Sequence, residues 1–244
     1  MTSLKGKYGV ITGGASGIGL AIATAFTAEG CHVTIADRAS EDKLAAAASQ
    51  ARAQARRVDV ANESEITSLF GSVAKQGGID ILVNCAGILI EKPLLETSAG
   101  DFDRLIGVNL KGVFLAGREA LRLMVRQDRG GRVINIASEL AYLGRENCSV
   151  YCASKGGVLS MTRSWAREFA PKILVNAIAP GPTDTPMLGI EQTSPETRAK
   201  ETQNPLGRLG QPEEIAAAAV FLAGPGATFM TGQCVSPNGG TAMF

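Results

Sequence analysis

Short runs of β-branched and other apolar residues alternate with longer helical patterns along the whole chain. Most of the strand-like runs are continuously apolar rather than alternating, which is typical of parallel strands covered on both faces. These runs are Gly9–Thr12, His32–Ala36, Arg57–Val60, Ile79–Asn84, Arg132–Ala137, Ile173–Ala177 and Gln233–Ser236. Helical patterns such as Ile18–Glu29 and Phe102–Arg126 lie between them. The alternation predicts an α/β fold with one doubly wound parallel sheet, in a single domain over residues 1–244.

One stretch departs from this alternation. Residues Pro182–Gln211 are rich in Pro, Thr, Glu and Gly and have no sustained periodicity. A connection of that length in a compact domain is either disordered or functional. Because it follows the carboxyl end of a strand, where sheets of this kind bind ligands, we expect a substrate lid over about residues 182–211.

Composition and charge argue against several classes of function. The 24 basic and 23 acidic residues are well mixed and leave a net charge of +1, so we expect no nucleic-acid partner. No apolar run approaches the ~20 residues of a membrane span, and residues 1–8 have no apolar signal-peptide core, so we expect no membrane association. The single histidine, His32, rules out zinc sites with two histidine ligands. No serine lies in a Gly-x-Ser-x-Gly motif, which argues against a hydrolase.

The five cysteines are odd in number and scattered along the chain. We interpret them as reduced thiols of a cytoplasmic protein. Cys148 and Cys152 are four residues apart, but no second Cys or His pair accompanies them. We therefore expect no metal site.

A glycine-rich turn follows the first predicted strand. The segment Thr12–Gly19 reads Thr-Gly-Gly-Ala-Ser-Gly-Ile-Gly and leads directly into a helical pattern. Glycines at positions 13, 17 and 19 let the backbone turn sharply and approach a pyrophosphate at the helix N-terminus, where free N–H groups favour anions. A plain glycine-rich connection remains the alternative at this point.

An acidic residue lies close to the end of each of the next two predicted strands. Asp37 can accept hydrogen bonds from both hydroxyls of an adenosine ribose, and its charge repels a 2′-phosphate. The neighbouring Arg38 would instead favour that phosphate. We give Asp37 more weight because it lies nearer the strand end, and we expect NAD rather than NADP. Asp59 is positioned either to meet the adenine ring or to cap the following helix.

Tyr151 and Lys155 are four residues apart on a predicted helix, Tyr151–Arg167, and therefore share one face. A free phenol titrates near ~10. An ammonium about 4 Å away supplies roughly 4 kcal/mol at an effective dielectric constant near 20, enough to lower that pKa by about three. Ser138 ends the fifth predicted strand, and its hydroxyl can hold a substrate oxygen within reach of the phenol. This arrangement predicts Tyr151 as a proton-transfer residue.

In order and spacing, these motifs resemble the short-chain dehydrogenase/reductase family, from Thr12 to Gly240. They are Thr12-Gly-x-x-x-Gly-x-Gly19, Asn84-Cys-Ala-Gly87, Asn109, Ser138, Tyr151-x-x-x-Lys155 and Pro180-Gly181. The resemblance implies a seven-stranded, Rossmann-like sheet and a homotetramer built on the Phe102–Arg126 and Tyr151–Arg167 helices. The chain departs from the family pattern at Cys85, Thr183 and Pro237-Asn238.

The resemblance also implies roles for individual residues. The catalytic residues would be Asn109, Ser138, Tyr151 and Lys155. A local bulge at Asn109, a poor helix former, would let its backbone carbonyl hold a relay water. The cofactor-binding residues would be Gly13, Ser16, Gly17, Ile18, Gly19, Asp37, Asp59, Val60, Asn84, Ala86, Gly87, Tyr151, Lys155, Pro180, Gly181, Thr183 and Thr185.

The expected substrate pocket is mainly apolar with one carboxylate, and Arg145 could turn into it. Its residues would be Ser138, Glu139, Leu140, Tyr142, Cys148, Tyr151, Pro182, Met187 and Leu188. We expect NAD-dependent interconversion of a secondary alcohol and a ketone, with a medium-sized, largely apolar or cyclic alcohol or a hydroxyacyl thioester as the substrate. Two alternatives stay open: a 3-oxoacyl-[acyl-carrier-protein] reductase that uses NADPH, and a non-catalytic redox sensor that binds NAD(H).

Overall fold

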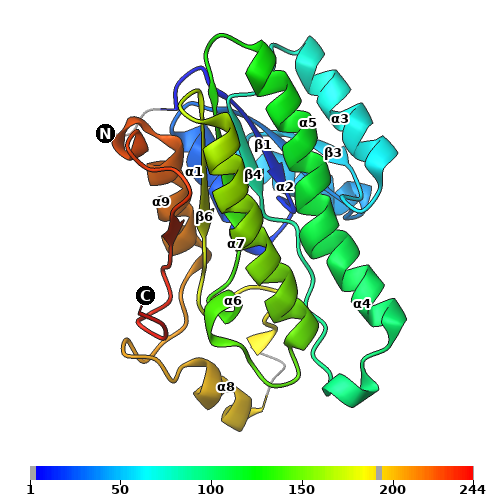
Figure 1. The fold of residues 1–244 in the computed structure, drawn as a ribbon, viewed down its shortest axis with the longest axis vertical. Coiled ribbons are helices and arrows are strands. Elements are labelled where there is room, and N and C mark those ends of the chain that lie inside the picture. Colours follow the sequence, from blue (N-terminus) through cyan, green and yellow to red (C-terminus); the bar gives the residue numbers. More distant parts are fainter. Residues whose placement is uncertain (1–3, 191–193, 244) are drawn as a thin grey trace.

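A computed structural model describes residues 4–190 and 194–243. Within these residues, seven strands form one parallel sheet in the order β3-β2-β1-β4-β5-β6-β7 (Figure 1). The strands are β1 Tyr8–Thr12, β2 His32–Asp37, β3 Gln54–Arg57, β4 Ile81–Asn84, β5 Gly131–Ile136, β6 Ile173–Ile178 and β7 Cys234–Val235. The strand order reverses between β1 and β4, which run side by side with Thr12 opposite Asn84. The predicted doubly wound α/β fold is confirmed.

Helices cover both faces of this sheet. One layer contains α1 Gly17–Ala28, α2 Glu41–Ala51 and α9 Pro212–Ala223. The other layer, in front in Figure 1, contains α3 Glu63–Lys75, α4 Ala99–Ile106, α5 Gly112–Arg126 and α7 Ser149–Phe169. Between sheet and helices lie two large apolar clusters: Ile22, Phe26 and Ile35 belong to one, Leu69 and Leu82 to the other. Burial on both sides explains why the central strands are apolar without alternation.

The third strand differs from its predicted bounds for a physical reason. The third strand is Gln54–Arg57, not Arg57–Val60. It lies at the edge of the sheet and is polar, so its sequence lacks the apolar run of a buried strand. Val58 and Val60, which suggested the strand, follow it and pack into the core cluster with α3.

The predicted long helix Phe102–Arg126 is interrupted at its centre. Gly107–Lys111 form a π-helical turn, η2, between α4 and α5, and this turn contains Asn109. The wider turn confirms the local bulge expected at that position. Among the described residues, no helix is long and apolar enough to cross a membrane.

The segment Pro182–Gln211 leaves the carboxyl end of β6 and returns to α9. Its two ends are paired by a bridge between Thr183 and Gly210, and Asp184 donates a 2.9 Å hydrogen bond from its backbone N–H to the Gly210 carbonyl. The sequence pattern did not predict the short helix within it, α8 Pro195–Glu201. Figure 1 shows α8 at the end of the molecule that also holds α6 Leu140–Leu143. Residues 191–193 of the expected lid lie outside the described residues.

Candidate active site

A cavity of about 320 Å³ opens at the carboxyl ends of the strands, at the point where the strand order reverses. Open α/β sheets bind ligands at such a switch point because loops from the two halves of the sheet diverge there. One end is lined by the glycine-rich turn and Asp37, and the other by Ser138, Tyr151 and residues of the segment that contains α8. The cavity therefore brings the predicted cofactor and reaction residues together.

Close packing explains the glycine-rich turn. A Cβ atom at Gly13 would lie 2.6 Å from the Cα atom of Ala86, and the φ angle of Gly13 is +68°. A Cβ atom at Gly19 would lie 2.1 Å from the Gly13 carbonyl oxygen. Ser16 is the N-cap residue of α1 but makes no side-chain cap hydrogen bond. The turn thus brings the start of α1 to the cavity, with backbone N–H groups suited to an anion.

Asp37, at the end of β2, is held against the same turn. Its Oδ2 atom accepts a 3.0 Å hydrogen bond from the Ala15 backbone N–H, and its Oδ1 atom accepts one of 3.0 Å from Ala39. Both Asp37 and Arg38 line the cavity. The carboxylate is therefore fixed at the cavity wall, whereas Arg38 is exposed.

Asp59 lines the cavity but does not cap the next helix. Its Oδ1 atom accepts a 2.9 Å hydrogen bond from the Ala61 backbone N–H. Asn62 caps α3 instead, because its Oδ1 atom accepts from Ser64 and Glu65. The capping alternative for Asp59 is therefore wrong.

Tyr151 and Lys155 lie near the start of α7, and both line the cavity. The Lys155 Nζ atom lies 5.7 Å from the centroid of the Tyr151 ring, on the shared helix face that their spacing predicts. Lys155 is buried and donates a 2.8 Å hydrogen bond to the Ile136 carbonyl. A hydrogen bond from Ser138 reaches the phenol of Tyr151, and the Ser138 Oγ atom accepts one of 3.2 Å from the Leu140 backbone N–H.

Burial is the main influence on the ionisation of this pair. Burial raises the pKa of Tyr151 to about 12, against the opposing effect of the Ser138 hydrogen bond. Burial also lowers the pKa of Lys155 to about 8. Burial is the largest effect on the pKa of Tyr151, and Lys155 is not among the groups that shift it here. The lowering of the phenol pKa by Lys155 beside a bound nicotinamide stays a prediction.

Asn109 and Asn84 support the site from behind. Asn109 is fully buried, and its side chain accepts a 2.8 Å hydrogen bond from the Ile88 N–H and donates one of 2.9 Å to the Ile88 carbonyl. The Asn84 Nδ2 atom donates a 2.9 Å hydrogen bond to Asn135 and so links β4 to β5. Neither Asn109 nor Asn84 is among the residues that line the cavity. Contact of either with a cofactor or a relay water stays a prediction.

Comparison with known proteins decides the family. A family profile described as enoyl-(acyl carrier protein) reductase matches residues 13–242. A short-chain dehydrogenase/reductase of Armillaria gallica is 37% identical over 250 residues, which cover 97% of this chain and 96% of that protein. The chain belongs to the short-chain dehydrogenase/reductase family. It is an oxidoreductase of that family that acts on CH–OH or keto groups.

Other relatives of this short-chain dehydrogenase/reductase are similar over nearly their whole length. A 3-oxoacyl-[acyl-carrier-protein] reductase of Thermotoga maritima is 40% identical over 247 residues, covering 97% of this chain and 98% of the relative. The crystal structure of a short-chain type dehydrogenase/reductase from Mycobacterium marinum superposes with a TM-score of 0.91. It is 33% identical and covers 97% of this chain and 96% of its own.

The residues present fit the nicotinamide dinucleotide that this family binds. Every predicted cofactor residue except Asn84 lines the cavity, from the glycine-rich turn to Thr185. Lys155 is buried, and among the described residues its Nζ atom makes one hydrogen bond, so further N–H groups are available to ribose hydroxyls.

The substrate end of the dehydrogenase differs from the sequence prediction in its polarity. Leu140, Cys148, Pro182, Met187 and Leu188 line the cavity as expected. Tyr142 does not, because its hydroxyl is directed to Cys234. Arg145 does turn inward, and Glu201 of α8 lines the cavity beside it, although no sequence signal pointed to Glu201. The pocket therefore holds two carboxyl groups and a guanidinium, not one carboxylate.

Proposed function

We propose that this chain is an NAD-dependent dehydrogenase that interconverts a secondary alcohol and a ketone, with Tyr151 as the proton-transfer residue. One observation carries the proposal: Tyr151, the buried Ser138 and Lys155, and the fixed carboxylate of Asp37 line one continuous cavity. A single extended ligand can therefore reach both ends. The predicted catalytic set of Asn109, Ser138, Tyr151 and Lys155 is retained in this proposal.

The chain's own residues would handle the hydroxyl proton. In alcohol oxidation, the Ser138 hydroxyl would orient the substrate oxygen, and the Tyr151 phenolate would accept its proton as the carbon loses a hydride. When bound, an oxidised nicotinamide supplies the hydride acceptor and a positive charge. Lys155 would hold the ribose and keep its ammonium near the phenol. Asn109 would connect Lys155 to solvent through a water on its backbone carbonyl.

Asp37 supports NAD over NADP. Its two hydrogen bonds to backbone N–H groups hold the carboxylate at the cavity wall, where it would accept both ribose hydroxyls and repel a 2′-phosphate. A reductase that uses NADPH and acts on 3-oxoacyl-[acyl-carrier-protein] is the second candidate. It is favoured by the relative of that name at 40% identity and by Arg38 at the cavity wall.

The test is formation of reduced nicotinamide by the purified protein. NAD⁺ and NADP⁺ would be offered separately with a panel of secondary alcohols, beside the Tyr151→Phe variant. We expect turnover with NAD⁺ and its loss in the variant, which should still bind cofactor. Preference for NADP⁺, together with reduction of a 3-oxoacyl thioester, would favour the second candidate. Tight NAD⁺ binding without turnover of any substrate would favour a redox sensor.

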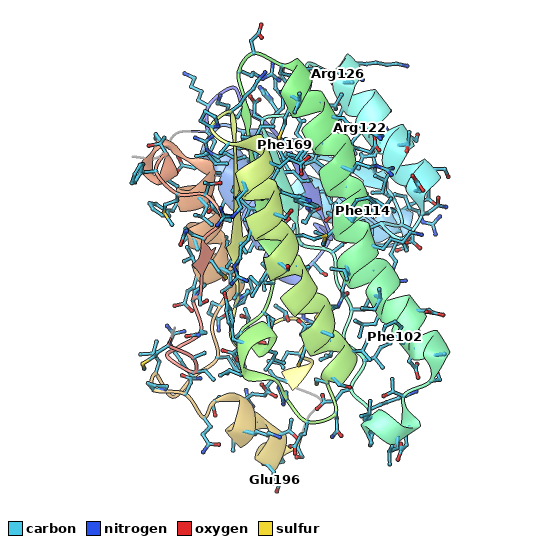
Figure 2. All side chains as sticks on the ribbon, in the orientation of Figure 1. Phe102, Phe114, Arg122, Arg126, Phe169 and Glu196 are labelled. Atoms are coloured by element: carbon cyan, nitrogen blue, oxygen red, sulfur yellow. The ribbon has the colours of Figure 1, made fainter. Side chains whose placement is uncertain are left out.

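We also propose a homotetramer that resides in the cytoplasm. The exposed helices α4, α5 and α7 lie side by side on one face, where Phe102 and Phe114 are 48% and 43% exposed (Figure 2). Exposed aromatic side chains on one helical face favour a subunit interface. All five cysteines are free thiols, which supports a reducing compartment. Sedimentation of the purified protein tests the assembly.

A further inference from the structure

Two buried polar atoms at the substrate end of the cavity have no hydrogen-bond partner among the described residues. Glu139 follows Ser138 directly, is only 4% exposed and lines the cavity. Thr241 makes a side-chain hydrogen bond to this carboxyl group, but the Oε2 atom has no partner among the described residues. The buried Nε atom of Arg145 likewise has none. Buried polar groups are nearly always paired, so an unpaired acceptor and an unpaired donor in one cavity indicate a ligand that satisfies both.

Neighbouring groups hold the Glu139 backbone and the Arg145 side chain in place. The backbone N–H of Glu139 donates a 3.1 Å hydrogen bond to the Pro180 carbonyl. Arg145, in the loop between α6 and α7, is paired through its Nη2 atom with the buried carboxylate of Glu201 on α8. Lys200 and Glu146 form a separate, more exposed ion pair. Contacts within the protein therefore position the Arg145 guanidinium and the Glu139 backbone.

The charge balance of the group limits the ligand. Glu201 is paired with Arg145, so the ion pair as a whole has no net charge to attract a substrate carboxylate. Burial and the nearby Glu201 raise the pKa of Glu139 to about 7, so this carboxyl is ionised in part of the molecules at neutral pH. An anionic substrate would meet a group whose net charge is zero or negative. A largely apolar substrate would leave both unpaired atoms buried, at a cost of the full desolvation of each.

A hydroxyl group meets both requirements because it donates one hydrogen bond and accepts others. We propose that the substrate is an uncharged, polyhydroxylated secondary alcohol, whose additional hydroxyl groups hydrogen-bond the Glu139 carboxyl and the Arg145 Nε atom close to the reacting carbinol. This inference rests on the proposed function and narrows its substrate class. It moves the substrate away from the largely apolar alcohol or acyl thioester that the sequence favoured.

Matched substrates test the inference. With NAD⁺, kcat/KM would be compared for 2,3-butanediol against 2-butanol and for cyclohexane-1,2-diol against cyclohexanol. A hydrogen bond to a charged group is worth about 10- to 100-fold, so each diol should exceed its mono-alcohol by that ratio. Sorbitol should exceed gluconate, which has similar hydroxyl groups and adds a carboxylate. Equal rates for diol and mono-alcohol, or preference for gluconate, would overturn the proposal.

Variants of Glu139 test whether this residue causes the preference for diols over mono-alcohols. Glu139→Leu should lower the diol-to-mono-alcohol ratio at least tenfold, whereas Glu139→Gln, which keeps an acceptor oxygen, should retain part of it. Glu146→Gln is the matched control, because Glu146 is exposed in the neighbouring loop and does not line the cavity. Its ratio should equal that of the unmodified protein. An unchanged ratio in Glu139→Leu would also overturn the assignment.

A binding measurement separates this inference from the proposed function. The Tyr151→Phe protein loaded with NAD⁺ would be titrated calorimetrically with 2,3-butanediol. Binding should weaken about tenfold or more when Glu139→Leu is added. If no alcohol is turned over, yet this Glu139-dependent binding is present, the dehydrogenase proposal fails and the polyol site stands. If mono-alcohols and diols are turned over alike and diol binding does not depend on Glu139, the dehydrogenase proposal stands and the polyol site is wrong.

Discussion

The carboxyl group of Glu139 should make the protein less stable as the pH rises. Burial and the proximity of Glu201 raise its pKa from an ordinary 4.5 to about 7, while Arg145 and a hydrogen bond with Thr241 oppose the rise. Between these two values the folded protein binds a proton that the unfolded chain has lost, so the stability from this group is present below pH 4.5 and lost through pH 7. Each pKa unit corresponds to about 1.4 kcal/mol, so the loss amounts to about 2–3 kcal/mol after some relaxation around the charge.

Glu139→Gln removes this titration and keeps the shape of the side chain. The free energy of unfolding would be measured by urea titration at pH 5, 6, 7 and 8, with the fluorescence of the single tryptophan, Trp165, as the signal. From pH 5 to pH 8, the free energy of unfolding of the variant should rise by about 2–3 kcal/mol relative to that of the unmodified protein. Parallel pH profiles for the two proteins would refute the argument that burial controls this carboxyl.

Glu146→Gln supplies the contrast in sign. Its hydrogen bond to Lys200 lowers the pKa of Glu146 below 4.5, so this carboxyl stabilises the protein above that pH and loses the effect only in more acidic solution. Between pH 5 and pH 8 the difference between this variant and the unmodified protein should stay constant. A slope like that expected for Glu139→Gln would point to a general effect of losing one negative charge.

Two further substitutions test packing and desolvation. Gly117→Ala should lower the free energy of unfolding by about 2 kcal/mol, because its Cβ atom would lie 2.4 Å from the Cη2 atom of Trp165. Gly71→Ala, in an open helical position, should instead raise the free energy of unfolding by up to about 1 kcal/mol. Equal urea midpoints for the two variants would contradict both predictions. Lys155→Met should abolish turnover yet stabilise the fold at pH 7 by about 1–2 kcal/mol, because burial lowers the pKa of Lys155 to about 8 and penalises its charged form. The destabilisation by charged Lys155 is complete below pH 8 and disappears above the ordinary lysine pKa of 10.5. A Lys155→Met variant that is less stable than the unmodified protein at pH 7 would contradict this prediction.

The local pattern of the sequence determined the fold and much of the cavity. Continuous apolar runs predicted buried parallel strands, and six of the seven lie within one or two residues of their predicted bounds. The spacing of Gly13, Gly17 and Gly19 predicted a turn that only glycine can form, and the spacing of Tyr151 and Lys155 predicted a shared helix face. These features depend on residues close together in the chain, whose relative positions follow from the geometry of one element.

Only the tertiary structure decided which charges the cavity holds and how they ionise. Arg145 and Glu201 are far apart in the chain and meet because α8 folds back over the strand ends, a contact that no periodicity encodes. The raised pKa of Tyr151 and the unpaired oxygen of Glu139 likewise depend on everything packed around them. Spacing along a helix gives the distance between two groups, but desolvation depends on the whole enclosure, and in this site desolvation is the larger effect.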